Sequence, residues 1–218
     1  MSTNSSQPTR TLSLTERRKA ATQLDIARAA AELFTERGPD GTTAEEIAQR
    51  AGVALRTFYR YFRNKQDAVG PLFAIGGDHW RERLAATEPG TALPRALESA
   101  VTATLTVPHE AKADGLRWTR GLLRAAAGDP ALRAVWYRVN QESEDRLIPL
   151  VARLAGDADP LEIRLAAAAA TDAIRVALET WAESDADVEG PGSPAELALR
   201  CLRELTGGLR LLTEPQKS

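Results

Sequence analysis

The sequence predicts an all-α protein in which a small helix-turn-helix domain precedes a larger helical domain. Sustained apolar-polar alternation, the mark of a half-buried strand, is nearly absent, and no Asn-Gly or Asp-Gly turn joins two β-branched runs. Proline, glycine, aspartate and serine instead divide the chain into about nine segments with helical periodicity. We expect helices at about residues 15–37, 43–50, 54–62, 66–86, 91–107, 109–127, 130–154, 160–185 and 193–212.

The composition is that of an ordinary globular protein, with 43% apolar and 27% charged residues in a chain of 218. The longest apolar run spans only residues 165–170, whereas a bilayer requires roughly 20 apolar residues. The first residues also lack the apolar core of a secretory signal, so we expect a cytoplasmic protein with no membrane partner. The lone Cys201 excludes an internal disulfide and a multi-cysteine metal site, and its leucine-rich surroundings favour a buried small side chain over a reactive thiol.

Charge divides the chain in two. Residues 1–67 carry eleven Lys and Arg against eight Asp and Glu, a net +3, and the remaining residues carry seventeen against twenty-two, a net −5. A basic excess confined to the first third is expected if only that part meets phosphate. We assign residues 1–14 to a disordered arm, 15–65 to the helix-turn-helix domain and 66–218 to the second helical domain.

Start and stop signals place three helices in the N-terminal domain. Gly38 follows the first segment as a stop. Thr43 and Glu46 stand three residues apart at the start of the second segment, which is the spacing of a capping box. After a turn at residues 51–53, Phe58 and Phe62 stand four residues apart and are expected to form the buried face of a third, short helix.

Four runs in this stretch carry a specific pattern: Thr42-Thr43-Ala44-Glu45-Glu46-Ile47-Ala48, Ala51-Gly52-Val53, Thr57-Phe58-Tyr59-Arg60-Tyr61-Phe62 and Asn64-Lys65. Together they resemble the signature of the TetR/AcrR family of transcriptional regulators over about residues 15–67. The rest of the chain agrees with that family only in being helical and in helix count. The resemblance implies a homodimer, usually a repressor, that binds double-stranded operator DNA and senses a small-molecule effector with its second domain.

The third helix is the expected recognition helix, which must bury one face and present the other to a major groove about 12 Å wide. Burial of the two phenylalanines leaves four residues pointing outward, Leu55, Arg56, Tyr59 and Arg60, with Thr57 at the flank. Arginine donates in pairs to guanine, and leucine packs on a thymine methyl, so Arg56, Arg60 and Leu55 are expected to read bases. By resemblance to the family, the phosphate-binding set is Thr43, Thr57, Tyr59, Tyr61 and Lys65, the last at the start of the fourth helix.

Two features of this domain leave alternatives open. The family often has serine at position 54, where its hydroxyl caps the recognition helix; Ala54 leaves that cap missing or supplied elsewhere, at about 1 kcal/mol. The basic residues Arg10, Arg17, Arg18 and Lys19 could reach phosphates or the minor groove, and could equally form a solvated tail.

The last two helices are the candidates for a dimer interface. Residues 165–170 place small side chains around one helix. The final helix carries a stripe of small and apolar residues: Ala198, Cys201, Leu202, Leu205, Gly208, Leu209 and Leu212. Paired about a two-fold axis, two such helices per subunit would form a four-helix interface, as the family typically has. The alternative is that both stripes face the protein's own core.

An effector site is expected in an apolar cavity among the fifth to eighth helices. The candidate wall residues are Trp118, Leu122, Trp136, Tyr137, Asn140 and Trp181, with Asn140 as a polar contact. The fourth helix, from Gln66 to about Ala86, would join this cavity to the DNA-binding domain. Gly70-Pro71 and Gly76-Gly77 are expected to make that helix easy to bend.

Other function classes find little support in the sequence. It contains no nucleophile elbow, metalloprotease helix, phosphate-binding loop or dinucleotide-binding glycine motif, and His79 and His109 are isolated. We therefore expect no enzyme activity, no cofactor and no metal. A helical adaptor that binds only protein would leave Arg56, Tyr59 and Lys65 without a role, and a transcriptional activator on the same fold stays open.

Overall fold

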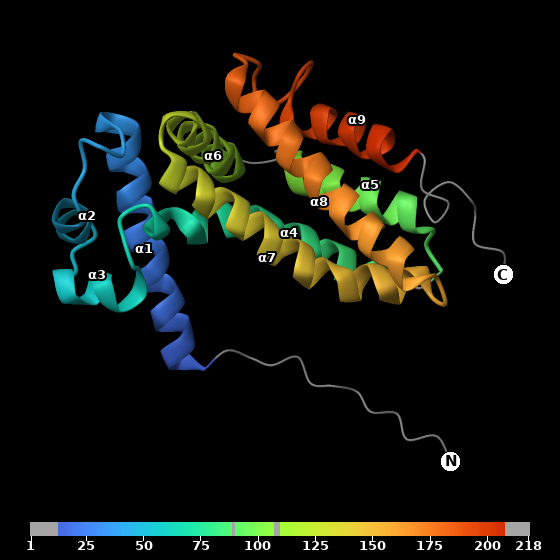
Figure 1. Cartoon of the computed structure of the whole chain (residues 1–218), viewed down its shortest axis with the longest axis horizontal. Helices are drawn as coiled ribbons and strands as arrows, with labels where there is room; N and C mark the ends of the chain where they lie inside the picture. Colours follow the sequence, from blue (N-terminus) through green and yellow to red (C-terminus); the bar gives the residue numbers. More distant parts are fainter. Residues whose placement is uncertain (1–12, 89, 107–109, 208–218) are drawn as a thin grey trace.

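The computed structural model describes residues 13–88, 90–106 and 110–207, and every regular element within these ranges is helical (Figure 1). In chain order the elements are α1 (Leu14–Arg37), α2 (Ala44–Arg50), α3 (Leu55–Tyr61), a 3-10 turn η1 (Asp67–Val69), α4 (Gly70–Ala85), α5 (Leu93–Leu105), α6 (Glu110–Gly128), α7 (Pro130–Ala155), α8 (Pro160–Glu183) and α9 (Pro194–Thr206). The predicted all-α class is confirmed.

Side-chain caps determine where several of these helices begin. Ser13 with Glu16, and Thr43 with Glu46, form complete capping boxes at the starts of α1 and α2. The second of these is the box that the sequence predicts. Ala54 provides no side-chain hydrogen bond to α3, so the expected loss of that cap is confirmed.

Two boundaries differ from the sequence expectation, and the end of the last expected helix is untested. The helix expected over 66–86 is divided, with η1 first and α4 starting at Gly70, so Pro71 lies in the first turn of α4. There its missing N–H breaks no helical hydrogen bond, and the expectation that it makes α4 easy to bend is wrong.

Of the arm expected over 1–14, Ser13 and Leu14 are the cap and first residue of α1, and residues 1–12 lie outside the described part. Residues 208–212 of the last expected helix, including Gly208, Leu209 and Leu212, lie outside it too.

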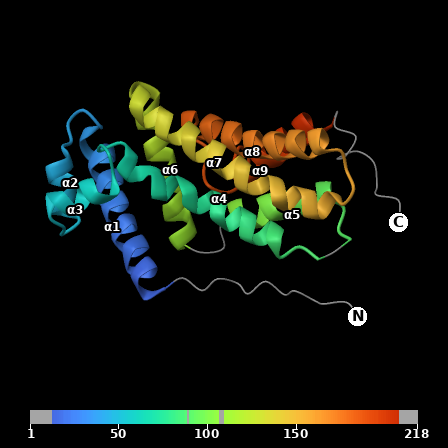
Figure 2. The same ribbon diagram turned by 60° about the horizontal axis from the view of Figure 1, so that its bottom comes forward.

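Helices α1–α3 form a small unit at one end of the molecule, and α4–α9 form a bundle that extends away from it (Figures 1 and 2). Helix α4 starts beside α1 and continues into the bundle alongside α7, so it contacts both parts. Helices α8 and α9 form an antiparallel pair on one side of the bundle. One continuous core runs through both parts, from Phe34 on α1 to Trp80 on α4 and Trp181 on α8.

Two contacts fasten the chain between α3 and α4 to helix α7. Gln66 Nε2 donates to Asp129 Oδ2 at 2.9 Å, and Arg138 Nη2 pairs with Asp67 Oδ1 at 2.8 Å. The other carboxylate oxygen of Asp129 caps α7 by accepting from the backbone N–H groups of Ala131 and Leu132. Burial opposes the charge of Asp129, but the hydrogen bonds from Gln66 and the helix backbone outweigh it and lower its pKa. This region is called the joint below, and its residues are 66, 67, 129 and 138.

The turn after α1 requires a glycine, and this yields a stability prediction. Gly38 has φ 75° and ψ 163°, a conformation that is essentially restricted to glycine. Because a Cβ there would meet no atom within 4 Å, Gly38→Ala should lower the free energy of unfolding by about 1–3 kcal/mol through backbone strain alone. Urea denaturation measures the change.

Gly76 provides the matched control, because it lies inside α4 and a Cβ there also meets nothing within 4 Å. Gly76→Ala should raise the free energy of unfolding by about 0.8–1 kcal/mol, the difference in helix propensity. If both variants changed the free energy of unfolding in the same direction, the explanation of Gly38 by backbone strain would be contradicted.

Candidate nucleic-acid interface and adjoining cavity

Helix α3 presents its polar face outward because its aromatic face is buried. Phe58 is fully buried and Phe62 is 7% exposed, with their ring centroids 5.7 Å apart in the core shared with α1 and α2. On the opposite face Arg56, Tyr59 and Arg60 are exposed. Leu55 and Thr57 are half-buried, and Leu55 packs against the core. Leu55, expected to point outward, is thus only partly exposed, because this apolar side chain at the start of the short helix also packs against the core. Its contact with a thymine methyl stays a prediction.

The two arginines of α3 have different surroundings. Arg56 makes no hydrogen bond or ion pair to any other residue that the structure describes. The guanidinium of Arg60 instead lies over the Tyr61 ring, 4.8 Å from its centroid, and donates to the Tyr61 hydroxyl at 3.1 Å. Arg60 and Tyr61 border a groove whose other wall is the first part of α1, with Arg18 and Lys19. The fold thus brings together basic residues whose role the sequence left open.

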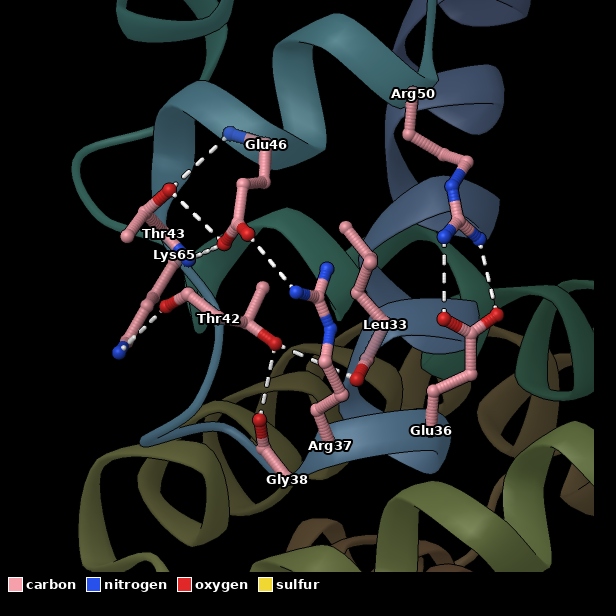
Figure 3. Close-up of polar contacts among 9 residues, drawn as sticks. All are labelled: Leu33, Glu36, Arg37, Gly38, Thr42, Thr43, Glu46, Arg50 and Lys65. Atoms are coloured by element: carbon pink, nitrogen blue, oxygen red, sulfur yellow. Dashed lines mark hydrogen bonds and ion pairs between the residues drawn. The ribbon is translucent and has the colours of Figure 1, made fainter.

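A buried hydroxyl holds α2 against α1 (Figure 3). Thr42 is 1% exposed, and its Oγ1 lies 3.0 Å from the carbonyl oxygen of Gly38 and 3.3 Å from that of Leu33. Its own carbonyl accepts from Lys65 Nζ at 2.9 Å. Lys65 is half-buried and precedes η1, so the expectation that it starts the fourth helix is wrong. The sequence analysis did not predict that Thr42 bonds to the end of α1. The only local indication was that a second threonine directly precedes Thr43, the N-cap of α2.

Ion pairs reinforce the same junction (Figure 3). Arg50 at the end of α2 donates twice to Glu36, at 3.0 and 3.1 Å, and Arg37 pairs with Glu46 at 2.9 Å. The backbone N–H of Thr43, its hydroxyl and Arg37 together hold the pKa of Glu46 below its ordinary value. The hydrogen bonds from Arg50 lower the pKa of Glu36 in the same way. The arrangement fixes the orientation of α2, and therefore of the exposed Thr43 at its start.

The bundle encloses a cavity of about 90 Å³ between α4, α5, α6, α7 and α8. Of the predicted wall residues, Trp136 and Asn140 border this cavity. Trp118, Leu122, Tyr137 and Trp181 do not. Tyr137 is 49% exposed because it follows Trp136 on α7 and points about 100° away from it around the helix. Leu122 and Trp181 are fully buried in the core, and Trp118 is half-buried against it.

Polar groups on the cavity wall are mostly committed to partners. Trp136 Nε1 donates to Glu179 Oε1 at 2.7 Å, and Asn140 Nδ2 donates to the Trp136 carbonyl at 2.9 Å. Arg81, 8% exposed, donates to Ser143 Oγ at 2.6 Å and pairs with Asp78. Burial lowers the pKa of Arg81, and the charge of Asp78 partly opposes that shift. The sequence analysis did not predict Arg81 as a wall residue. Arg81 is four residues from Gly77 and eight from Phe73, which border the same cavity, so this helical spacing could have indicated it.

Helices α8 and α9 divide their small and apolar residues between two faces. Alanines 166, 167 and 170, together with Ala198 and Leu202, are buried within the subunit. For these residues the alternative of packing in the protein's own core is the observed one. The exposed apolar side chains are Leu161, Leu165 and Val176 on α8 and Leu205 on α9. Among the described residues of α8 and α9, this second group comprises the large apolar side chains that a partner could cover.

The described residues lack the features of two other classes of protein. They contain no group of three or more histidine, cysteine, aspartate or glutamate side chains arranged to hold a metal ion. None of the helices in the described ranges combines the length and the apolar character needed to span a bilayer.

Known proteins resemble this chain in sequence and in fold. The family model of bacterial regulatory proteins, TetR family, matches residues 26–69. The transcriptional regulator TcmR of Streptomyces glaucescens, of the helix-turn-helix type, is 29% identical over 196 residues, covering 87% of this chain and 86% of TcmR. The TetR-family repressor AlkX from Dietzia sp. strain DQ12-45-1b has the same fold, with a TM-score of 0.55 and 20% identity over 87% of this chain and 98% of AlkX. The multidrug binding protein EbrR, solved with imidazole, gives a TM-score of 0.52 and 20% identity over 84% of this chain and 93% of EbrR.

The capping box of α2 should make the N-terminal unit sensitive to acid. Because the folded-state pKa of Glu46 is lowered, its carboxylate stabilises the fold above the ordinary glutamate pKa of about 4.3. That stabilisation is lost as the pH falls from there through the folded-state pKa. Glu46→Gln should therefore be less stable than the parent at pH 7 and should lose less stability between pH 5 and pH 3, as measured by urea denaturation.

Glu45→Gln is the matched control, since it removes an exposed carboxylate from the same turn while leaving the Glu46 hydrogen bonds in place. This variant should keep the acid dependence of the parent. If Glu46→Gln also kept it, the capping carboxylate would not be the acid-sensitive group.

Proposed function

Because residues 26–69 match the model of the TetR family of bacterial regulatory proteins and TcmR is similar over most of the chain, we propose that this protein is a TetR-family repressor that binds a palindromic operator as a homodimer. In this proposal a small molecule in the bundle cavity releases the protein from DNA. The observation that carries the DNA-binding part is the exposed, unpaired Arg56 on a helix whose other face is locked by Phe58. Repression is the usual behaviour of the family.

The surroundings of each residue support a division between base reading and phosphate binding. Arg56 is free to place its guanidinium on a guanine edge, and Tyr59 is 53% exposed beside it. Arg60 is stacked on Tyr61 in the groove shared with Arg18 and Lys19, where three cations suit the DNA backbone better than a base. We therefore reassign Arg60 from base reading to phosphate binding. The proposed phosphate set is Arg18, Lys19, Thr43, Thr57, Arg60, Tyr61 and Lys65.

Dimerisation through α8 and α9 is supported by their exposed apolar residues. Leu161 and Leu165 are four apart on α8 and lie on one face, 65% and 44% exposed. Leu205 on the neighbouring α9 is 47% exposed. A second copy related by a two-fold axis would cover both helices and place two recognition helices on one side of the DNA. A spacing of roughly 34–36 Å between them would match successive major grooves.

The size of the cavity supports the proposed switch. Its volume of about 90 Å³ is below the roughly 300–1,000 Å³ of ordinary ligand pockets, so an organic effector must displace part of the wall. Helix α4 is one wall of the cavity and also contacts α1, so its displacement would move the DNA-binding unit. A coupling of about 1–3 kcal/mol per site would be typical of such a switch.

The base-reading role of Arg56 gives the principal test of the DNA-binding proposal. Footprinting of DNA upstream of the protein's own gene should identify a palindromic site. Arg56→Ala should weaken binding to that site by about 1–3 kcal/mol and relax the preference at one base pair in each half-site, because one base-edge contact is lost. Equal losses on the operator and on random DNA would show that Arg56 does not read sequence, and no specific site at all would favour the protein-binding adaptor.

Lys65→Met is the contrasting variant in the same titrations. If Lys65 contacts phosphate, the variant should weaken binding to both DNAs alike and reduce the salt dependence of log K by about one unit per subunit. If the variant is less stable but the salt dependence is unchanged, Lys65 has only a structural role, through its hydrogen bond to the Thr42 carbonyl.

Leu205→Glu tests the dimer. Because Leu205 is half exposed in the single chain, a glutamate there should leave the subunit folded. It would become a desolvated, unpaired charge only where a partner covers it. We expect monomers by analytical ultracentrifugation and a marked loss of operator affinity. Leu14→Glu, at the exposed start of α1, should remain dimeric; a dimeric Leu205→Glu would move the interface elsewhere.

A further inference from the structure

The cavity wall holds two buried hydrogen-bonding groups that have no partner within the described structure. The indole Nε1 of Trp80 and the hydroxyl of Thr171 are inaccessible to solvent and unpaired. Their residues are 2% and 5% exposed, and both side chains border the cavity, one from α4 and the other from α8. Buried polar groups are rarely left in this state, because each forfeits its hydrogen bonds to water without replacement.

Thr171 is exceptional among the threonines of this cavity. Thr104 and Thr119 also border it, and each donates its hydroxyl to the carbonyl four residues earlier, at 2.8 and 3.0 Å. That bond is the usual solution for a threonine inside a helix. Thr171 also lies inside a helix, α8, but its hydroxyl does not make this hydrogen bond to the helix backbone. Its hydroxyl therefore has no partner among the described residues, and a molecule that displaces part of the cavity wall can supply one.

Trp80 adds a group that can only donate, since an indole nitrogen has no acceptor capacity. The other indole at this wall, that of Trp136, is committed to Glu179. A molecule that satisfies Trp80 must therefore present an acceptor atom such as a carbonyl oxygen. An acceptor can serve Thr171 in the same way, because its hydroxyl is also able to donate.

The remaining wall argues for an uncharged, largely apolar ligand. Much of it is aliphatic and aromatic: Leu72, Phe73, Val101, Leu105, Leu116, Trp136, Val139, Ile174 and Leu178. The charge of Arg81 is already opposed by Asp78, and Arg146 pairs with Asp78 and Glu142. A bound anion would thus find no unpaired cation at this wall, and its burial would be unfavourable.

We propose that the effector of this protein is an uncharged, apolar, ring-sized or larger molecule whose acceptor oxygen, of the carbonyl type, accepts hydrogen bonds from Trp80 Nε1 and Thr171 Oγ1. This inference rests on the proposed function in placing the effector in the cavity. It goes beyond that function in naming the chemical class and the two residues that recognise it.

The test compares two molecules of nearly equal size and shape, acetophenone and ethylbenzene, which differ by the carbonyl oxygen. Calorimetric titration of the full-length protein should give about tenfold tighter binding of acetophenone, a difference of about 1.4 kcal/mol, because its oxygen satisfies buried donors that ethylbenzene leaves unpaired. In an ¹⁵N-labelled protein the indole N–H signal of Trp80 should shift with acetophenone and much less with ethylbenzene.

Thr171→Val and Trp80→Phe should each reduce the preference for acetophenone, and Thr104→Val, whose hydroxyl is already bonded, should preserve it. Thr171→Val should also melt at a higher temperature than the parent without ligand, since it removes an unpaired buried hydroxyl. A higher melting temperature would show that the Thr171→Val variant is folded, so a reduced preference for acetophenone could not be attributed to misfolding.

The outcomes separate this inference from the proposed switch. Equal binding of the two molecules, or a preference that survives both variants, would overturn the assignment of Trp80 and Thr171. Failure of both molecules to bind would overturn it as well. If acetophenone is preferred as expected but leaves operator affinity unchanged, the assigned ligand class stands and release of DNA through this cavity fails.

Discussion

The surface proposed to face DNA depends on the burial of two aromatic rings. Helices α2 and α3 have seven residues each, far fewer than the roughly 12–15 at which an isolated helix becomes even marginally stable in water. Helix α3 also lacks a side-chain cap. Its direction is therefore set by Phe58 and Phe62, which are anchored in the core against α1 and α2. Arg56 points outward as a consequence of that burial.

The same constraint determines how a distant event could affect DNA binding. A helix held only by core packing cannot turn alone without exposing the rings that hold it, so α1, α2 and α3 are expected to move together. Buried Thr42 and the two inter-helical ion pairs strengthen this unit. The adjustable part is then the joint, together with α4, where the chain leaves the unit and enters the bundle.

Features governed by short sequence separations could be predicted from the sequence. The capping box at Thr43, the stop at Gly38 and the spacing of Phe58 and Phe62 each involve residues within a single turn or two. The cavity wall could be predicted only in part, because it depends on which side of each helix meets the others. Trp136 and Tyr137 are adjacent in sequence, yet one borders the cavity and the other is half exposed. The partner of Lys65 is 23 residues away in sequence, and no local pattern indicates it.

One carboxylate at the joint has two roles that cannot be separated. Asp129 both accepts the first free backbone N–H groups of α7 and holds the Gln66 side chain. Fraying of the first turn of α7 and loosening of its contact with Gln66 are therefore expected to occur together. Amide hydrogen exchange at the start of α7 would then also report the opening of the contact with Gln66, although those amides lie entirely within α7. The first turn of α7 thus carries information about a contact that lies outside that helix.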